Sequence, residues 1–255
     1  MLEFTVGADP ELFLRKGNKI MSAIGLIGGT KKEPKPMEGL PKGYAVQEDN
    51  VLVEFNIPPA KYMCDFEDSI KTSLGYVSGI AGKHGMTLSK KASASLTSDQ
   101  LKHPLAHVFG CDPDFNVWTL EANPRPYSED PNLRSAGGHI HVGVALKNSE
   151  KILLGRWMDF LIGVPFAAAD PDTKRMQLYG KAGSIRFKPY GIEYRTPSNN
   201  WIFKPKIRAR LFALIQRCIQ KASQGTNPQY SMDLLAAMDR GDKEPLKAFA
   251  SDWDL

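Results

Sequence analysis

The sequence has few cysteines and no pair spaced for a zinc knuckle. Its three cysteines in 255 residues, Cys64, Cys111 and Cys218, are far apart and odd in number. A disulfide framework is therefore excluded, and a reducing, cytoplasmic compartment is expected. Residues 1–5 include a glutamate and no basic stretch, so we expect no signal peptide there.

The sequence also lacks an uninterrupted apolar run. Its most apolar window, residues 152–169, is broken by Arg156, Asp159 and Pro165. This window predicts a buried helix and excludes a membrane as a partner. No GxxxxGK[ST] stretch is present, which excludes the nucleotide site of P-loop enzymes.

The chain carries a modest excess of positive charge. The 33 Lys and Arg residues exceed the 28 Asp and Glu residues, and the formal net charge is +5. This balance suits anionic substrates such as nucleotides, but the basic residues are too dispersed to predict a nucleic-acid groove.

Repeats and long linkers are absent too, so we expect a single domain over residues 1–255. Most expected strands are separated by loops or by single helices, without a βαβ rhythm. This order predicts an α+β fold with a mainly antiparallel sheet and helices packed on one face. Helices are expected near residues 65–83, 149–168 and 205–224, and two short ones after residue 231.

Two of the five histidines occur one residue apart in Gly138-His139-Ile140-His141-Val142-Gly143. Because side chains alternate along a strand, His139 and His141 share one face and Ile140 and Val142 share the other. Two imidazoles on one face are good ligands for a metal or an anion. The alternative is a hydrogen-bonded pair on a half-exposed strand.

Three more strand-like segments carry a glutamate among apolar residues. Glu11 lies in Asp-Pro-Glu-Leu-Phe, Glu54 in Leu-Val-Glu-Phe-Asn, and Glu193 in Gly-Ile-Glu-Tyr-Arg. A carboxylate in such surroundings is costly unless it is paired or bound to a cation. We expect these glutamates to converge with the histidines on one face of a sheet. Carboxylates with an imidazole and no thiolate favour Mg²⁺ or Mn²⁺.

Basic residues accompany the last of these segments. Arg195 is two residues from Glu193 and shares its face, and a glycine-punctuated loop over residues 175–186 supplies Lys181 and Arg186. Cations held by carboxylates beside arginines are what phosphoryl transfer from ATP requires. The alternative for Arg195 is a surface ion pair with Glu193.

A second basic loop is expected over residues 25–43, which are rich in Gly, Pro and Lys. Its lysines either close over an anion or are simply solvated.

Four motifs in this order resemble a known enzyme family. They are Gly7-Ala8-Asp9-Pro10-Glu11, the run Asp49–Asn56, Gly138–Gly143 with its two histidines, and Gly191–Pro197. Together, over roughly residues 4 to 205, the chain resembles the phage-type carboxylate–amine ligases of the phiEco32-like type 2 family. That family is similar to the catalytic domains of glutamine synthetase and glutamate–cysteine ligase, so the resemblance implies a sheet of that type.

The resemblance implies an ATP-dependent ligase that forms an amide bond. A carboxylate is phosphorylated to an acyl phosphate, and an amine then displaces the phosphate. By this resemblance, two or three Mg²⁺ or Mn²⁺ ions around ATP are held by Glu11, Glu54, His139 and Glu193, with Asp49 as a further acidic contact.

The resemblance also assigns catalytic roles. His141 would face the substrate or the γ-phosphate, Arg186 and Arg195 would stabilise the phosphates and the acyl phosphate, and Lys181 would be a further phosphate contact. Asp9 is one candidate for the base that deprotonates the amine. No motif marks the adenine pocket.

The implied partners are a small-molecule or peptide carboxylate and an amine, with nucleic acid only as a modified-base acceptor. If the chain is encoded by a phage, its compartment is the host cytoplasm. No segment before Glu11 is long enough for the N-terminal domain of glutamine synthetase, so its ring assembly is not implied. Two alternatives are a metal-dependent hydrolase and a catalytically inactive binding protein of the same fold.

Overall fold

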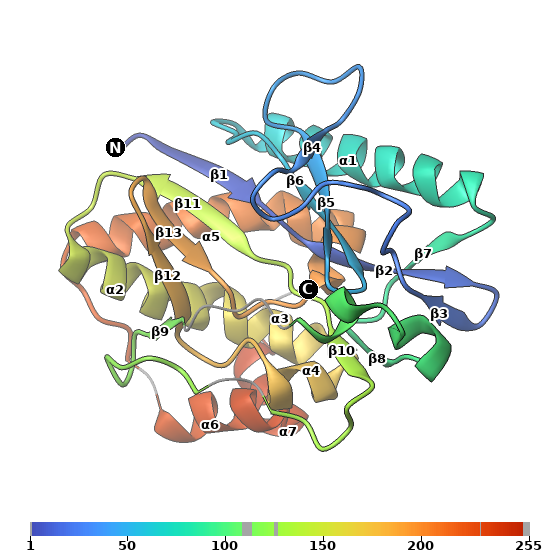
Figure 1. Cartoon of the computed structure of the whole chain (residues 1–255). Helices are drawn as coiled ribbons and strands as arrows, with labels where there is room; N and C mark the ends of the chain where they lie inside the picture. The colour runs from blue at the N-terminus through green and yellow to red at the C-terminus, as the bar shows by residue number, and fades with distance from the viewer. Residues whose placement is uncertain (1, 109–113, 125–126, 230, 252–255) are drawn as a thin grey trace.

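The strands form two larger antiparallel sheets that meet where the chain passes from its first strand to its second (Figure 1). The computed structural model describes residues 2–108, 114–124, 127–229 and 231–251. Cys64 and Cys218 are free thiols. Cys111 lies outside the described residues.

The first sheet brings together segments from both ends of the chain. Its strand order is β1-β11-β13-β12-β9. The bounds are Phe4–Ala8 for β1, Ile140–Val144 for β11, Gly191–Tyr194 for β13, Ser184–Lys188 for β12 and Phe115–Asn116 for β9. All of its pairings are antiparallel, as the sequence predicts.

The second sheet is built mainly from the N-terminal part of the chain. Its order is β3-β2-β6-β5-β4, and β7 also pairs with β2. The bounds are Lys19–Met21 for β3, Glu11–Lys16 for β2, Leu52–Asn56 for β6, Ala45–Asp49 for β5, Lys35–Pro36 for β4 and Thr87–Ser89 for β7. A separate ribbon pairs β8 (Ser93–Ser95) with β10 (Leu133–Ser135).

The helices Asn148–Met158 and Pro205–Ser223 lie behind the first sheet, whereas Met63–Lys83 lies along the second (Figure 1). The bounds are Met63–Lys83 for α1, Asn148–Met158 for α2, Val164–Ala169 for α3, Thr173–Leu178 for α4, Pro205–Ser223 for α5, Met232–Arg240 for α6 and Lys243–Ala250 for α7. A π-helical turn, η3 (Asp159–Gly163), joins α2 to α3, and the 3₁₀ turns are η1 (Ser98–Leu101), η2 (Pro104–His107) and η4 (Asn199–Phe203). The expected α+β class with antiparallel strands is confirmed.

One helical stretch, Asn148–Ala169, is long and apolar enough to cross a membrane by length and composition. However, 61% of its most apolar window is buried inside the protein. Leu154, Met158 and Ile162 in this stretch belong to the main hydrophobic core. This burial agrees with the expected core helix.

Alternation along β11 separates the core from the opposite face of the first sheet. Ile140 and Val142 are fully buried in the hydrophobic core. His141 points the other way and is only half-buried. The apolar residues therefore fix the register of the strand, and this register directs the histidines away from the helices.

The expected loop over residues 175–186 is partly wrong. Residues Thr173–Leu178 form α4, which Asp172 caps by accepting a hydrogen bond from the amide of Arg175 at 3.2 Å. Arg186 lies on β12, where it pairs in register with Glu193. The glycines that suggest a loop are confined to the turn between α4 and β12, at Gly180 and Gly183.

Gly138 allows the close approach that seats the histidine strand. Its amide donates to the carbonyl of Pro197 at 3.0 Å, and its carbonyl accepts from Trp201 Nε1 at 3.0 Å. A Cβ atom at this position would overlap the carbonyl of Ser198 and the indole nitrogen of Trp201. Because backbone cannot yield as a flexible side chain does, this position requires glycine.

We therefore expect Gly138→Ala to lower the free energy of unfolding by about 3 kcal/mol, since the new methyl group forces β11 away from η4. The matched control is Gly79→Ala in α1, where no atom lies within 4 Å of the added Cβ. This control should raise the stability by about 0.5–1 kcal/mol. Urea denaturation of both variants measures the difference, and equal stabilities would contradict the prediction.

Candidate functional site

The tripeptide Asp9-Pro10-Glu11 spans the junction of the two sheets, between β1 and β2. On one side it is hydrogen-bonded to the segment before β11: the amide of Asp9 donates to His139 at 3.4 Å and that of Glu11 to Gly137 at 2.9 Å. On the other side, the amide of Phe55 donates to Pro10 at 3.3 Å. The two acids are therefore held where three segments meet, and each joins a different group of side chains.

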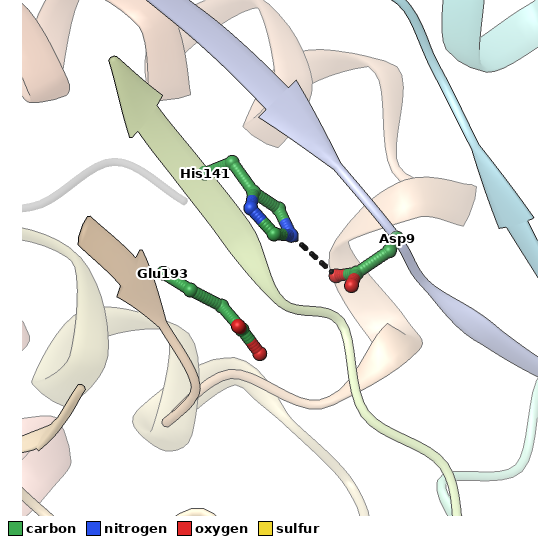
Figure 2. Close-up of side chains that lie close together, drawn as sticks. All are labelled: Asp9, His141 and Glu193. Atoms are coloured by element: carbon green, nitrogen blue, oxygen red, sulfur yellow. Dashed lines mark ion pairs between the residues drawn. The ribbon is translucent and has the colours of Figure 1, made fainter. Parts of the chain in front are cut away.

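The first group consists of Asp9, His141 and Glu193, whose side chains point into one space (Figure 2). One ligand atom from each lies within 4.8 Å of the others. His141 Nε2 lies 3.0 Å from Asp9 Oδ1. The cross-strand register of β11 and β13 places His141 directly opposite Glu193. The convergence predicted for His141 and Glu193 is thus present.

His139 lies beside this group and is more deeply buried. Its Nδ1 is 3.6 Å from Asp9 Oδ1 and 3.8 Å from Glu193 Oε1. Burial and the nearby charge of Arg195 lower the pKa of His139. Burial also acts on His141, but the Asp9 carboxylate outweighs it and raises the pKa of His141. The surroundings therefore shift the pKa values of the two imidazoles in opposite directions.

Three cationic side chains surround Glu193. Lys188 Nζ lies 2.8 Å from Oε2, Arg186 Nη1 lies 3.5 Å from the same oxygen, and Arg195 forms a direct ion pair with Oε1. Burial acts against ionisation, but the charges of His139 and Arg195 lower the pKa of Glu193 to about 2. Glu193 is therefore a buried, ionised carboxylate among cations. Figure 2 shows it beside His141.

Arg195 is held from several sides. Its Nε lies 3.3 Å from Asp114 Oδ2, and its Nη2 donates to the hydroxyl of Tyr179. The guanidinium of Arg195 also lies 5.5 Å from the centre of the Tyr179 ring. The alternative interpretation, a surface ion pair with Glu193, is wrong in one respect: the ion pair is present, but Arg195 is only 4% exposed and Glu193 only 1% exposed.

The second group consists of Glu11, Asp49 and Glu54, again with ligand atoms within 4.8 Å of one another. Glu11 and Glu54 pair in register between β2 and β6, and Asp49 ends β5. Glu11 Oε2 accepts a hydrogen bond from the amide of Gly137 at 2.6 Å. The three carboxylates therefore come from three neighbouring strands of the second sheet. The expectation that Glu11 and Glu54 converge with the histidines on one face of one sheet is wrong, because they belong to a different sheet and a different group.

The charges of the second group repel one another. Burial and the charge of Asp49 raise the pKa of Glu11 to about 7. Burial, with the charges of Asp9 and Glu11, raises the pKa of Glu54 well above its ordinary value. A divalent cation among these oxygens would relieve the repulsion, and oxygen ligands are those that Mg²⁺ and Mn²⁺ prefer.

The donors present fit divalent cations at both groups. The second offers three carboxylates, and the first offers two carboxylates with an imidazole. In addition, the buried Nε2 of His139 has no hydrogen-bond partner among the described residues. A buried polar atom in that state is unusual in a folded protein and typical of a ligand site.

The side chain of Lys181 points away from both groups. Its ammonium donates to the carbonyl of Asp239 in α6 at 2.9 Å. The resemblance implies a phosphate contact for Lys181, but the carbonyl that its ammonium contacts belongs to α6, which lies far along the chain. Conversely, Lys188 was missed, although it lies two residues after Arg186 and so shares its face.

Asp159 supports the first group from behind the sheet. Its carboxylate accepts hydrogen bonds from the hydroxyl of Tyr194 at 2.7 Å and from Trp118 Nε1 at 2.6 Å. Tyr194 lies next to Glu193 on β13, and Asp159 begins the π-helical turn η3. Burial raises the pKa of Asp159 to about 7, despite its hydrogen bonds from Tyr194 and Trp118.

This shift predicts a pH-dependent stability. Between the ordinary pKa of 3.8 and the raised value of about 7, the folded protein retains a proton that the unfolded chain releases. The contribution of Asp159 is therefore complete below the unfolded pKa and is lost as the pH rises to about 7. Relative to Asp159→Asn, the unfolding free energy of the unmodified protein should fall by up to about 4 kcal/mol over that window.

Urea denaturation of both proteins at several pH values measures this difference. A difference that does not vary with pH would contradict the raised pKa of Asp159. Asp130→Asn serves as a control, because hydrogen bonds from Ser95 and Asn132 lower the pKa of that exposed carboxyl.

A comparison with protein families finds the expected family in the C-terminal half of the chain. The sequence matches the family described as phage phiEco32-like COOH·NH2 ligase-type 2 over residues 125–254. This match includes both histidines, Arg186, Glu193 and Arg195, whereas Glu11 and Glu54 lie outside the matched residues. No curated protein matches the sequence.

Two similar solved structures are those of GmaS. The first, described as apo GmaS without ligand, is 13% identical, with a TM-score of 0.49, over 97% of this chain and 65% of that one. The second, described as a GmaS/ADP complex, is 12% identical, with a TM-score of 0.48, over 98% of this chain and 68% of that one. The chain thus spans about two thirds of the length of either structure.

Proposed function

The chain belongs to the phage phiEco32-like COOH·NH2 ligase-type 2 family, and we propose that it joins a carboxylate to an amine with ATP and Mg²⁺ or Mn²⁺. The product would be an amide, formed through an acyl phosphate. The observation that carries the proposal is the junction of the sheets, where Asp9 and Glu11 enter two adjacent groups of candidate metal ligands.

Each group would hold one divalent cation. Glu11, Asp49 and Glu54 are assigned to one cation. Asp9, His141 and Glu193 are assigned to the other, and His139 completes that site through its buried ring. When bound, such cations neutralise the phosphate oxygens of ATP, so that an anionic carboxylate can approach the γ-phosphorus.

The basic side chains of the first group would bind the remaining negative charge. Arg186, Lys188 and Arg195 lie together around Glu193. With a cation bound to Glu193, these side chains would interact less strongly with that carboxylate. They would then be available to bind a phosphate or an acyl phosphate. Arginine suits this role because its fork of donors matches the oxygens of a phosphate. Lys181 has no place in this proposal, since its ammonium is bonded to Asp239.

Asp9 is better placed as a ligand than as the base that deprotonates the amine. Burial opposes its ionisation, but the imidazole of His141 outweighs this effect and holds the pKa of Asp9 well below its ordinary value. A weakly basic carboxylate accepts protons poorly. We therefore assign Asp9 to the first cation. The free thiols Cys64 and Cys218 suit the reducing cytoplasm proposed for the chain.

The activity test is release of ADP and phosphate from MgATP, with pooled amino acids as carboxylates and polyamines as amines. Substrates should stimulate release, and Glu54→Gln or Glu193→Gln should reduce it by more than about 100-fold, because each removes a charged ligand. Glu244→Gln is the matched control, since Glu244 lies on the surface in α7 with its side chain 87% exposed. Release that persists unchanged in both site variants would contradict the proposal.

Two further outcomes would favour the alternatives. Hydrolysis of added esters or amides with metal but without ATP would support a metal-dependent hydrolase. If MgATP does not bind at all, an inactive binding protein of this family is favoured instead.

The affinity for Mn²⁺ distinguishes the proposed roles of His139 and His141. His141→Ala should weaken binding of Mn²⁺ by about 10-fold to 100-fold, since His141 lies with Asp9 and Glu193 as a candidate ligand. His139→Ala should weaken it less, because His139 lies beside the group of Asp9, His141 and Glu193 and is not one of its three candidate ligands. Calorimetric titration of both variants makes the comparison. The reverse order would show that His139 is the main ligand.

A further inference from the structure

Lys31 lies at the second carboxylate group. Its Nζ is 2.8 Å from Asp49 Oδ2, and Asp49 belongs with Glu11 and Glu54. The carboxylate of Asp49 is largely buried at 14% exposed, whereas the side chain of Lys31 is 44% exposed. A cation of the protein itself therefore already contacts one of the three acids.

The loop that carries Lys31 is fixed to β5 by the residue next to Asp49. Glu48 Oε1 accepts hydrogen bonds from the amides of Gly25, Ile27 and Gly28, at 2.9, 3.1 and 2.8 Å. Its own amide donates to the carbonyl of Gly29 at 3.3 Å. Two consecutive residues of β5 thus act together, since Glu48 holds the backbone of the loop and Asp49 holds its lysine.

The tip of this loop is a tight turn. Thr30 and Glu33 exchange backbone hydrogen bonds of 3.0 and 3.1 Å, so Lys31 and Lys32 are the two central residues. Gly29, just before the turn, has φ +80° and packs so closely that a Cβ would lie 2.6 Å from the carbonyl of Val46. Lys31 therefore projects from a built turn that is packed against the sheet.

We propose that Lys31 is a tethered counter-ion of the Glu11–Asp49–Glu54 group, which a divalent cation must displace in order to bind there. The inference rests on the proposed function, because it takes this group as a metal site. An ammonium on Asp49 occupies an oxygen that the metal needs, and it repels a second positive charge nearby. Lys31 thereby sets the affinity of this site for metal.

Displacement leaves Lys31 beside the bound cation. The turn remains anchored through Glu48, so the ammonium stays within reach of the site. There it would meet whatever anion the metal binds, and a phosphate group of the nucleotide has the right charge. Of the lysines in the expected basic loop over residues 25–43, Lys31 thus has a specific role as a counter-ion and phosphate contact.

Titration of the metal-free protein with Mn²⁺ alone, without nucleotide, tests the proposal. Lys31→Ala should bind Mn²⁺ about five-fold tighter at one site, because a partly exposed ion pair no longer competes. Lys31→Arg keeps the charge and should bind as the unmodified protein does. Lys32→Ala is the matched control, since Lys32 is the other central residue of the same turn and its loss changes the net charge equally.

A second measurement uses the unmodified protein. Reductive methylation followed by mass spectrometry reports how readily each lysine reacts. Mg²⁺ should increase the labelling rate of Lys31 several-fold, because the ammonium leaves Asp49, and should leave Lys32 unchanged.

The outcomes distinguish this proposal from the proposed function. If Mn²⁺ binds the unmodified protein and Lys31→Ala equally well, and Mg²⁺ leaves the labelling of Lys31 unchanged, the counter-ion role is overturned while the metal sites stand. If neither protein binds Mn²⁺ at any site, the proposed metal sites fail, and the counter-ion role fails with them.

Discussion

The structure depends on one constraint, which is that five buried or half-buried acids must share the junction of two sheets. Proline between Asp9 and Glu11 ends β1 and prevents the strand from continuing, so that β2 starts in the second sheet. The two acids consequently enter different groups: Asp9 joins Glu193, and Glu11 joins Asp49 and Glu54. Carboxylates at this density are tolerated only where cations balance them.

The negative charges of the two groups are offset by different means. Around Glu193, the charges of His139 and Arg195 outweigh burial, and its pKa falls to about 2. Around Glu11, burial and the charge of Asp49 prevail, and its pKa rises to about 7. The cations of the chain therefore offset more negative charge in the first group than in the second. A lysine that a divalent cation displaces would therefore matter most at the second group.

Much of the fold and the site could be predicted because the relevant patterns are local. Alternation around His139 and His141 gave the correct face, since Ile140 and Val142 are buried in the core. Glu11, Glu54 and Glu193 stood out because carboxylates are costly among apolar neighbours. Contacts between distant segments could not be predicted in this way. The division of the strands into two sheets, the bond from Lys181 to Asp239 and the contact between Lys31 and Asp49 depend on packing that no spacing reveals.

The same packing connects the core to the chemistry. Asp159 lies on the helix side of the first sheet, where the hydroxyl of Tyr194 donates to it, and Glu193 lies next to Tyr194 on the other face. Strand β13 therefore presents Tyr194, which is hydrogen-bonded to Asp159, on one face and Glu193, the proposed metal ligand, on the other. Because Tyr194 and Glu193 are adjacent on β13, the hydrogen bond from Tyr194 to Asp159 ties the position of Glu193 to the packing of η3. The rigidity of the core behind β13 is thus part of what positions the site.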